Sequence, residues 1–198
     1  GTYNRHLLAT GLTADTQPVT LAIATEQLSI PANMLRHERT RKGGAVESAD
    51  LVILWPSREG YSDEMVDAFR EGTPNAPVIY ATITARDGAM DATARLDAVY
   101  ARFFTGKALP APEGLTARAL ADNSGYGGEI VYFVPDAPRP FVARCLSVAT
   151  PEVPATCLRD INIGRSLSLL YRFNRDLLPD WKALDAAMRE LGESFIVR

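Results

Sequence analysis

Short β-rich segments alternate with turns along the C-terminal part of this 198-residue chain, and this alternation limits the possible folds more than any other feature. Strands are predicted at 115–121, 129–134, 141–148, 156–163 and 166–173. The turns between them are too short for the crossover connection that parallel neighbours need. Successive strands therefore pair in antiparallel order, and the pattern predicts an antiparallel meander.

The N-terminal part adds further strands and two helices. Strands are predicted at 19–23, 27–30, 50–55 and 78–83. Ser62 is a typical N-cap residue, and Asp63 and Glu64 follow it where the helix dipole favours negative charge. A helix is therefore predicted from there to Gly72. A second helix is predicted over 91–104, because its apolar residues fall on one stripe.

The clearest helical period belongs to the C-terminal segment. Apolar residues recur there at spacings of three and four, at Leu177, Trp181, Leu184, Met188, Leu191 and Phe195. Such a stripe has to be buried against a sheet. The predicted fold class is therefore α+β, a mainly antiparallel sheet of about 6–8 strands packed against three helices, the last an amphipathic C-terminal helix. Residues 1–17 are predicted to be a flexible lead-in or linker, and 18–198 a single domain.

The overall charge and hydropathy bear on the partners. The formal net charge is −3 at pH 7, so attraction of the whole molecule to nucleic acid is not expected. No apolar run approaches the roughly 18 residues that span a bilayer. We expect contact with a membrane only through an anchor that lies outside this sequence.

Two cysteines, Cys145 and Cys157, occupy neighbouring predicted strands, with Pro151 and Pro154 between them. If the hairpin folds about Pro151, the two Cβ atoms face each other at about 4.5–5.5 Å, which is near bridging distance. A disulfide is therefore predicted, and a loop this short gives about 3 kcal/mol of stability in the chain-entropy model. Such a bond indicates an oxidising compartment, the periplasm or the cell exterior. The alternative is a pair of reduced, buried cysteines in a cytosolic protein.

No catalytic set is recognised in the sequence. The two histidines, His6 and His37, lie in a polar lead-in and a basic loop, and no G-x-S-x-G elbow accompanies either. No zinc ligand set and no cofactor motif are recognised, since the glycines at 125–128 lack the lysine of a phosphate-binding loop. The carboxylates considered for a hydrolase are Glu59, Asp63, Glu64, Glu129 and Asp160. Nothing in the sequence fixes a distance between any two of them.

A basic loop stands out against the acidic composition. Its members are Arg36, His37, Arg39, Arg41 and Lys42. One interpretation is a positive patch that binds an anionic surface, such as phospholipid head groups, an envelope polymer or an acidic protein face. The interpretation that we favour is a solvated loop whose arginines pair with Glu47, Asp50 or Glu59.

Trp55 and Tyr61 bracket a polar turn directly after a predicted buried strand. In one interpretation they line a small groove. In the other, which we favour, they pack a corner between the strand and the following helix.

Four groups of residues carry a family resemblance. They are 30–36 (IPANMLR), Asp50-Leu51 with Leu54-Trp55-Pro56, Gly60-Tyr61, and Tyr171-Arg172-Phe173 followed by Trp181. Together they resemble a group of uncharacterised alphaproteobacterial envelope proteins, which look like single-span membrane proteins with a periplasmic bulk. The resemblance covers most of 19–195 and implies a periplasmic domain tethered to the inner membrane, with no catalytic residue to carry over. The order of elements also resembles the Mog1/PsbP-type α-β-α sandwich, which concerns the fold alone.

Three functions fit these observations. The first is a noncatalytic extracytoplasmic envelope domain that binds a protein or an anionic polymer. The second is a carboxylate-based hydrolase with a cleft near Trp55 and Tyr61. The third is a structural or assembly protein that acts through oligomerisation. A deep pocket with two converging carboxylates would favour the second, and a shallow surface would favour the first.

Overall fold

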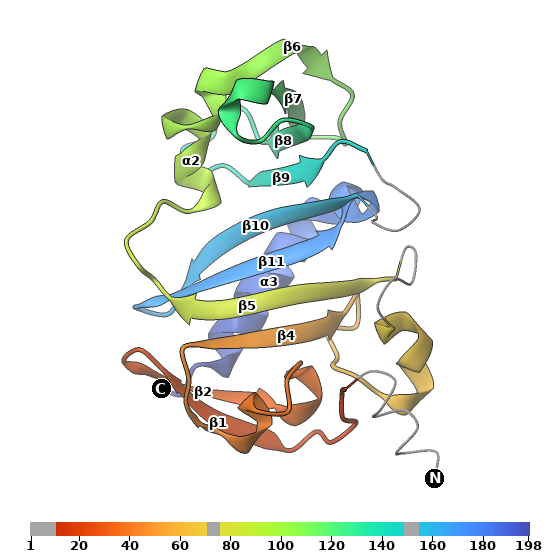
Figure 1. Ribbon diagram of the computed structural model, residues 1–198, viewed down its shortest axis with the longest axis vertical. Helices are drawn as coiled ribbons and strands as arrows, with labels where there is room; N and C mark the ends of the chain where they lie inside the picture. Colours follow the sequence, from red (N-terminus) through yellow and green to blue (C-terminus); the bar gives the residue numbers. More distant parts are fainter. Residues whose placement is uncertain (1–10, 71–75, 149–154) are drawn as a thin grey trace.

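The computed structural model describes residues 11–70, 76–148 and 155–198, whose strands form a large and a small sheet (Figure 1). The large sheet contains β4 (Ser48–Leu54), β5 (Val78–Ala85), β6 (Phe104–Leu109), β7 (Thr116–Leu120), β8 (Glu129–Phe133), β9 (Val142–Leu146), β10 (Thr156–Ile163) and β11 (Leu167–Asn174). The small sheet contains β1 (Pro18–Ile23), β2 (Glu26–Pro31) and β3 (Gly44–Ala45). The α-helices are α2 (Ala92–Ala98) and α3 (Trp181–Phe195). Short 3-10 segments are η1 (Ala32–Met34), η2 (Thr40–Lys42), η3 (Asp63–Phe69), η4 (Tyr100–Phe103), η5 (Asp122–Ser124) and η6 (Arg175–Asp180).

The predicted meander and the α+β fold class are confirmed. Strand order in the large sheet is β4-β5-β11-β10-β9-β8-β7-β6, so β7 to β11 are neighbours in sequence order. All pairings in this sheet are antiparallel. Within the predicted lead-in, Leu12 is buried against the underside of a small apolar cluster, whereas residues 1–10 lie outside the described part.

The first predicted helix is present as 3-10 turns rather than as α-helix. η3 contains a break at Met65, whose φ of −105° and ψ of 18° are not helical, and Ser62 makes no capping hydrogen bond through its side chain. Nucleation of a helix is unfavourable, and a segment this short forms too few helical hydrogen bonds to offset it. The burial of Phe69 against Tyr61 therefore decides its shape.

The second predicted helix is shorter than expected. Its N-cap is Asp91, whose carboxylate accepts a hydrogen bond from the Ala94 N–H at 2.8 Å. The α-helix ends at Ala98, because Val99 has a φ of −127° and a ψ of −63°, and η4 then carries Tyr100 into an apolar cluster. The strand that follows, β6, was not predicted, since its sequence is short of β-branched residues and almost all of it is exposed.

Helix α3 covers one face of the large sheet, as its apolar stripe predicts (Figure 1). Leu184 and Met188 are fully buried and Phe195 is nearly so. The inward residues of β10 and β11 complete this main core, and they are Cys157, Ile161, Ile163, Leu167, Leu169, Tyr171 and Phe173.

The opposite face of the large sheet is covered at its two ends. Helix α2 and η4 pack over β7 to β9, and η3 packs beside β4 and β5. Between them no helix of the described residues crosses the strands (Figure 1). We call this surface the open face. Its side chains stand in three cross-strand rows, Leu158–Arg172–Tyr80, Asp160–Leu170–Thr82 and Asn162–Ser168–Thr84.

The predicted disulfide between Cys145 and Cys157 is confirmed. The two residues lie directly opposite each other on β9 and β10, with their Cα atoms 4.0 Å apart, and both are fully buried. The strands share one further residue pair, Arg144 with Leu158, whereas β10 and β11 pair along the full length of both strands. The covalent bond thus reinforces the shortest ladder of the large sheet. The predicted turn at Pro151 and Pro154 lies outside the described residues.

Candidate functional site

A cleft of about 490 Å³ lies where helix α2 meets the open face. Its floor consists of outward side chains of β10 and β11. One wall is the segment 86–91, which leads from β5 into α2, and the other is formed by Arg144 on β9 with Tyr126. The cleft is continuous with the open face, because Asp160 and Leu170 belong to both.

Asp160 fixes the start of α2 to the sheet. Its carboxylate accepts a hydrogen bond from the Ala92 N–H at 2.7 Å, and both terminal nitrogens of Arg95 lie 3.4 Å from its oxygens. Burial alone would lower the pKa of Arg95, but the charge and hydrogen bond of Asp160 act together with those of Tyr100 and raise that pKa. The Arg95 guanidinium therefore stays charged inside the cleft.

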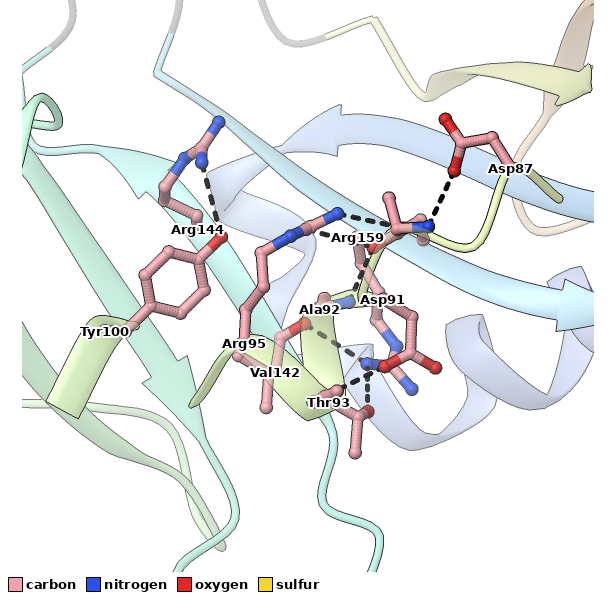
Figure 2. A network of polar contacts seen from close by, with 12 residues as sticks. Asp87, Asp91, Ala92, Thr93, Arg95, Tyr100, Val142, Arg144 and Arg159 are labelled. Carbon is pink, nitrogen blue, oxygen red and sulfur yellow. Dashed lines mark hydrogen bonds and ion pairs between the residues drawn. The ribbon is translucent and has the colours of Figure 1, made fainter. Parts of the chain in front are cut away.

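The second wall is an aromatic and cationic stack. The Arg144 guanidinium lies 4.3 Å from the centre of the Tyr126 ring, and it donates to the Tyr100 hydroxyl at 3.3 Å (Figure 2). The Tyr100 and Tyr126 rings meet edge to face at 5.7 Å. Glu129 accepts a hydrogen bond from Arg144 Nε at 2.9 Å. Because the guanidinium is held on three sides, this wall is rigid.

Arg159 lies beneath the cleft and is 5% exposed. The pairing of β9 with β10 ends at Arg144 and Leu158, and the two strands separate after that pair. Arg159 bridges the gap by donating to the Val142 carbonyl at 3.2 Å and the Thr93 hydroxyl at 3.3 Å (Figure 2). Its Nε donates to Asp185 at 2.7 Å, which ties β10 to α3. Burial alone would lower the pKa of Arg159, but the hydrogen bond and charge of Asp185 raise it.

The same carboxylate holds a buried tyrosine. The Tyr171 hydroxyl donates to Asp185 at 2.7 Å, and burial together with the negative charge of Asp185 raises the pKa of Tyr171 well above its ordinary value. This network was not recognised in the sequence. The signal that would have revealed it is an arginine at an inward position of β10, between Cys157 and Ile161.

Apolar side chains at the cleft are exposed to an unusual degree. Met90, in the segment before α2, is 45% exposed, and Leu170, in the middle row of the open face, is 41% exposed. Leu158 lies next to them on β10. The cleft therefore combines apolar contact area with arginine and tyrosine side chains.

The carboxylates of the cleft serve as hydrogen-bond acceptors for the backbone. Asp87 accepts from the Ala89 N–H at 2.8 Å, and Asp91 and Asp160 accept from the first residues of α2. Glu129, considered for catalysis, is paired with Arg144, and Asp63 accepts from the Tyr61 hydroxyl at 3.1 Å, away from the cleft. Across 11–70, 76–148 and 155–198, no cluster of three or more acidic, histidine or cysteine side chains is arranged to hold a metal ion.

The basic loop is divided between structural and exposed side chains. His37 pairs with Asp50 at 2.8 Å, and Arg41 donates to the Leu35 and Gly11 carbonyls at 2.8 and 3.0 Å. Arg39 and Lys42 are exposed.

The remaining basic residue of the loop, Arg36, reaches the open face. Its guanidinium lies 5.1 Å from the centre of the Tyr80 ring, and that of Arg172 lies 5.3 Å from the same ring. Nearby, Asp50 accepts hydrogen bonds from Thr82 at 2.7 Å and from His37. Burial alone would raise the pKa of Asp50, but these two hydrogen bonds lower it.

Trp55 and Tyr61 do not line an open groove, the interpretation that we did not favour, because both side chains are buried, at 8% and 1% exposure. Trp55 belongs to the main core, and Tyr61 packs against Phe69 in a separate cluster. The turn between them is held by Asn33. Its side-chain amide donates to the Tyr61 backbone carbonyl at 3.0 Å, and its backbone carbonyl accepts from the Tyr61 N–H at 2.9 Å. The packed corner is the correct interpretation.

Among the described residues no helix has both the length and the apolar character to cross a bilayer. No protein-family model and no curated protein matches the sequence.

Two solved structures are similar to this chain. One is Smlt3025, an immunity protein of the Stenotrophomonas maltophilia type IV secretion system, with 18% identity and a TM-score of 0.60 over 92% of this chain and 94% of that one. Another is the Neisseria meningitidis iron-regulated outer membrane lipoprotein FrpD, with 13% identity and a TM-score of 0.57 over 93% of this chain and 95% of that one. This chain therefore shares the fold of those two proteins over nearly its whole length.

Proposed function

We propose that this protein is a noncatalytic extracytoplasmic domain that binds another protein through the open face and its cleft. The observation that carries the proposal is Leu170, a large apolar side chain 41% exposed in the middle of a sheet face that no described helix covers. Met90 exposes a similar fraction at the rim of the cleft. Apolar side chains grouped in this way point to an interaction surface, whereas scattered ones do not.

The residue types around Leu170 support a protein partner. Tyrosine, arginine and methionine are enriched at the centres of protein interfaces. The cleft presents Tyr126, Arg144, Arg95 and Met90 next to one another. Arg144 and Arg95 are already fixed by Glu129 and Asp160, so little side-chain entropy is lost when a partner packs on them.

A hydrolase is less well supported. Asp91 and Asp160 at the cleft accept hydrogen bonds from backbone N–H groups at the start of α2. A general acid or nucleophile needs an oxygen aimed at the substrate, whereas these side chains maintain the fold around the cleft. The cleft is thus better explained as a binding surface.

The disulfide supports an extracytoplasmic location, because such bonds persist in oxidising compartments. The two proteins of similar fold carry the names of an immunity protein and an outer membrane lipoprotein. We further propose that the domain is tethered to the inner membrane by a segment outside this sequence, as the resemblance to single-span envelope proteins implies.

The test is affinity capture from an envelope extract of the source organism, with immobilised wild type and two variants. Leu170→Asp places a charge in the middle of the open face. Leu109→Asp is the matched control, because Leu109 is 38% exposed on the edge strand β6, away from the cleft. We expect one protein, identified by mass spectrometry, to bind to wild type and Leu109→Asp and to be lost with Leu170→Asp.

Capture of no protein, or equal capture by both variants, would overturn the proposal. Light scattering supplies a second readout. If wild type is a dimer and Leu170→Asp is a monomer, the occupant of the open face is a second copy of this chain and the heterologous partner is wrong.

A further inference from the structure

We infer that the partner presents an acidic side chain to Arg172, next to an apolar side chain that covers Leu170. The inference rests on the proposed function and names the chemistry of the segment that docks on the open face. Leu170 and Arg172 are two residues apart on β11 and point to the same side of the sheet. Their side chains therefore emerge about 7 Å apart.

The two carboxylates at the open face, Asp160 and Asp50, are occupied within the fold. Asp160 accepts from the Ala92 N–H and faces Arg95, and Asp50 accepts from Thr82 and His37. Neither carboxylate is therefore in need of a basic partner side chain. The open face therefore gives no reason to expect a positively charged partner segment.

Arg172 is in the opposite situation. Its side chain is exposed, and within the described residues it contacts the Tyr80 ring but makes no hydrogen bond or ion pair with a carboxylate. An arginine carries five N–H donors in a planar fork that matches the two oxygens of a carboxylate. Stacking on Tyr80 holds that fork in place above the sheet, ready for an acceptor from outside.

The geometry also favours an extended segment. The outward positions run along β11 in the order Ser168, Leu170 and Arg172, with a constant spacing of about 7 Å. Ser168 is half-buried and polar, Leu170 is exposed and apolar, and Arg172 is exposed and cationic. An extended chain repeats its side chains on one side at the same spacing. A strand-like segment with an acidic residue two positions from an apolar one matches Arg172 and Leu170 together.

The probe is a phage-displayed library of random peptides, selected on the immobilised full chain. We expect the enriched peptides to carry Asp or Glu two positions from Leu, Ile, Phe or Met. A synthetic peptide of that sequence should bind Arg172→Glu about tenfold or more weakly than wild type, because a charge-assisted hydrogen bond is replaced by repulsion. Selection on Arg172→Glu should enrich Lys or Arg at the acidic position.

The matched control is Arg102→Glu, which makes the same charge change at an exposed arginine on η4 and should leave peptide binding unchanged. Enrichment of no peptide, or of peptides without an acidic residue, would overturn the inference, as would equal loss of binding with both variants. If the peptide is lost with Leu170→Asp but binds normally to Arg172→Glu, the docking face stands and the acidic partner is wrong. Capture of no protein from the envelope extract, or equal capture by Leu170→Asp and Leu109→Asp, would instead count against the proposed function.

Discussion

Removal of the disulfide is expected to cost the fold about 3 kcal/mol. The bond closes a loop with a sequence separation of 12, for which the loop-closure entropy of the unfolded chain gives that value at 25 °C. Backbone pairing offers little compensation, because β9 and β10 share two residue pairs. With an m-value of about 1–3 kcal/mol per molar urea, the unfolding midpoint should fall by about 1–3 M.

The assay is urea unfolding of the oxidised wild type, the reduced wild type and the Cys145→Ala/Cys157→Ala variant. The reduced protein keeps both sulfur atoms, so it separates the closure effect from the loss of buried volume, and thiol titration confirms its state. The double variant should be at least as unstable as the reduced protein, since truncation also leaves a cavity. A loss below about 1 kcal/mol in both would refute the reasoning, and would mean that Arg159 and its contacts hold the two strands together.

Three further changes test other parts of the structure. Arg159→Met removes the buried cation that pairs with Asp185 and should lower the free energy of unfolding in urea by about 3–5 kcal/mol. The double variant Arg159→Met/Asp185→Leu should regain much of that loss, and an equal cost for both would contradict the ion-pair explanation. Leu170→Asp should change the free energy of unfolding by less than about 0.5 kcal/mol, because the side chain is already exposed, and a larger loss would show that Leu170 supports the fold. The pKa of Asp50 is lower in the folded state than its ordinary value of 3.8, so its ionised carboxylate stabilises the fold above that pH, and this stability is lost as the pH falls through the folded-state pKa. The difference in free energy of unfolding between wild type and Asp50→Asn should therefore stay constant from neutral pH to about pH 4 and shrink below it. A difference that grows on acidification would contradict this explanation.

Local periodicity made the main elements predictable. The stripe on α3 and the alternation along β10 each repeat within one segment, so the sequence alone indicates which side is buried. The disulfide was predictable for the same reason, because Cys145 and Cys157 lie at symmetric distances from a proline-containing turn. The corner between Trp55 and Tyr61 was open to two interpretations, since Asn33, which hydrogen-bonds to Tyr61, is 28 residues away along the chain.

The cleft was beyond the reach of such patterns. It depends on the return of the segment after β5 to β10, where the Ala92 N–H meets Asp160 across 68 residues. A backbone donor has no sequence signature, and an aspartate at an outward strand position looks like any solvated carboxylate. The pairing of His37 with Asp50 was not predicted either, because the favoured interpretation assigned the nearby carboxylates to the arginines of the basic loop.

Because the disulfide joins β9 to β10 and the cleft is lined by both strands, we expect the redox state of the two sulfur atoms to be linked to occupancy of the cleft. A molecule seated there touches Arg144 on one half of the sheet and Leu158 and Leu170 on the other, so it braces the seam that Cys145 and Cys157 close. By thermodynamic reciprocity, if reduction of the disulfide weakens binding of that molecule by some factor, then binding of the molecule lowers the equilibrium constant for reduction by the same factor. An oxidising environment and a bound partner would thus both stabilise the contact between β9 and β10.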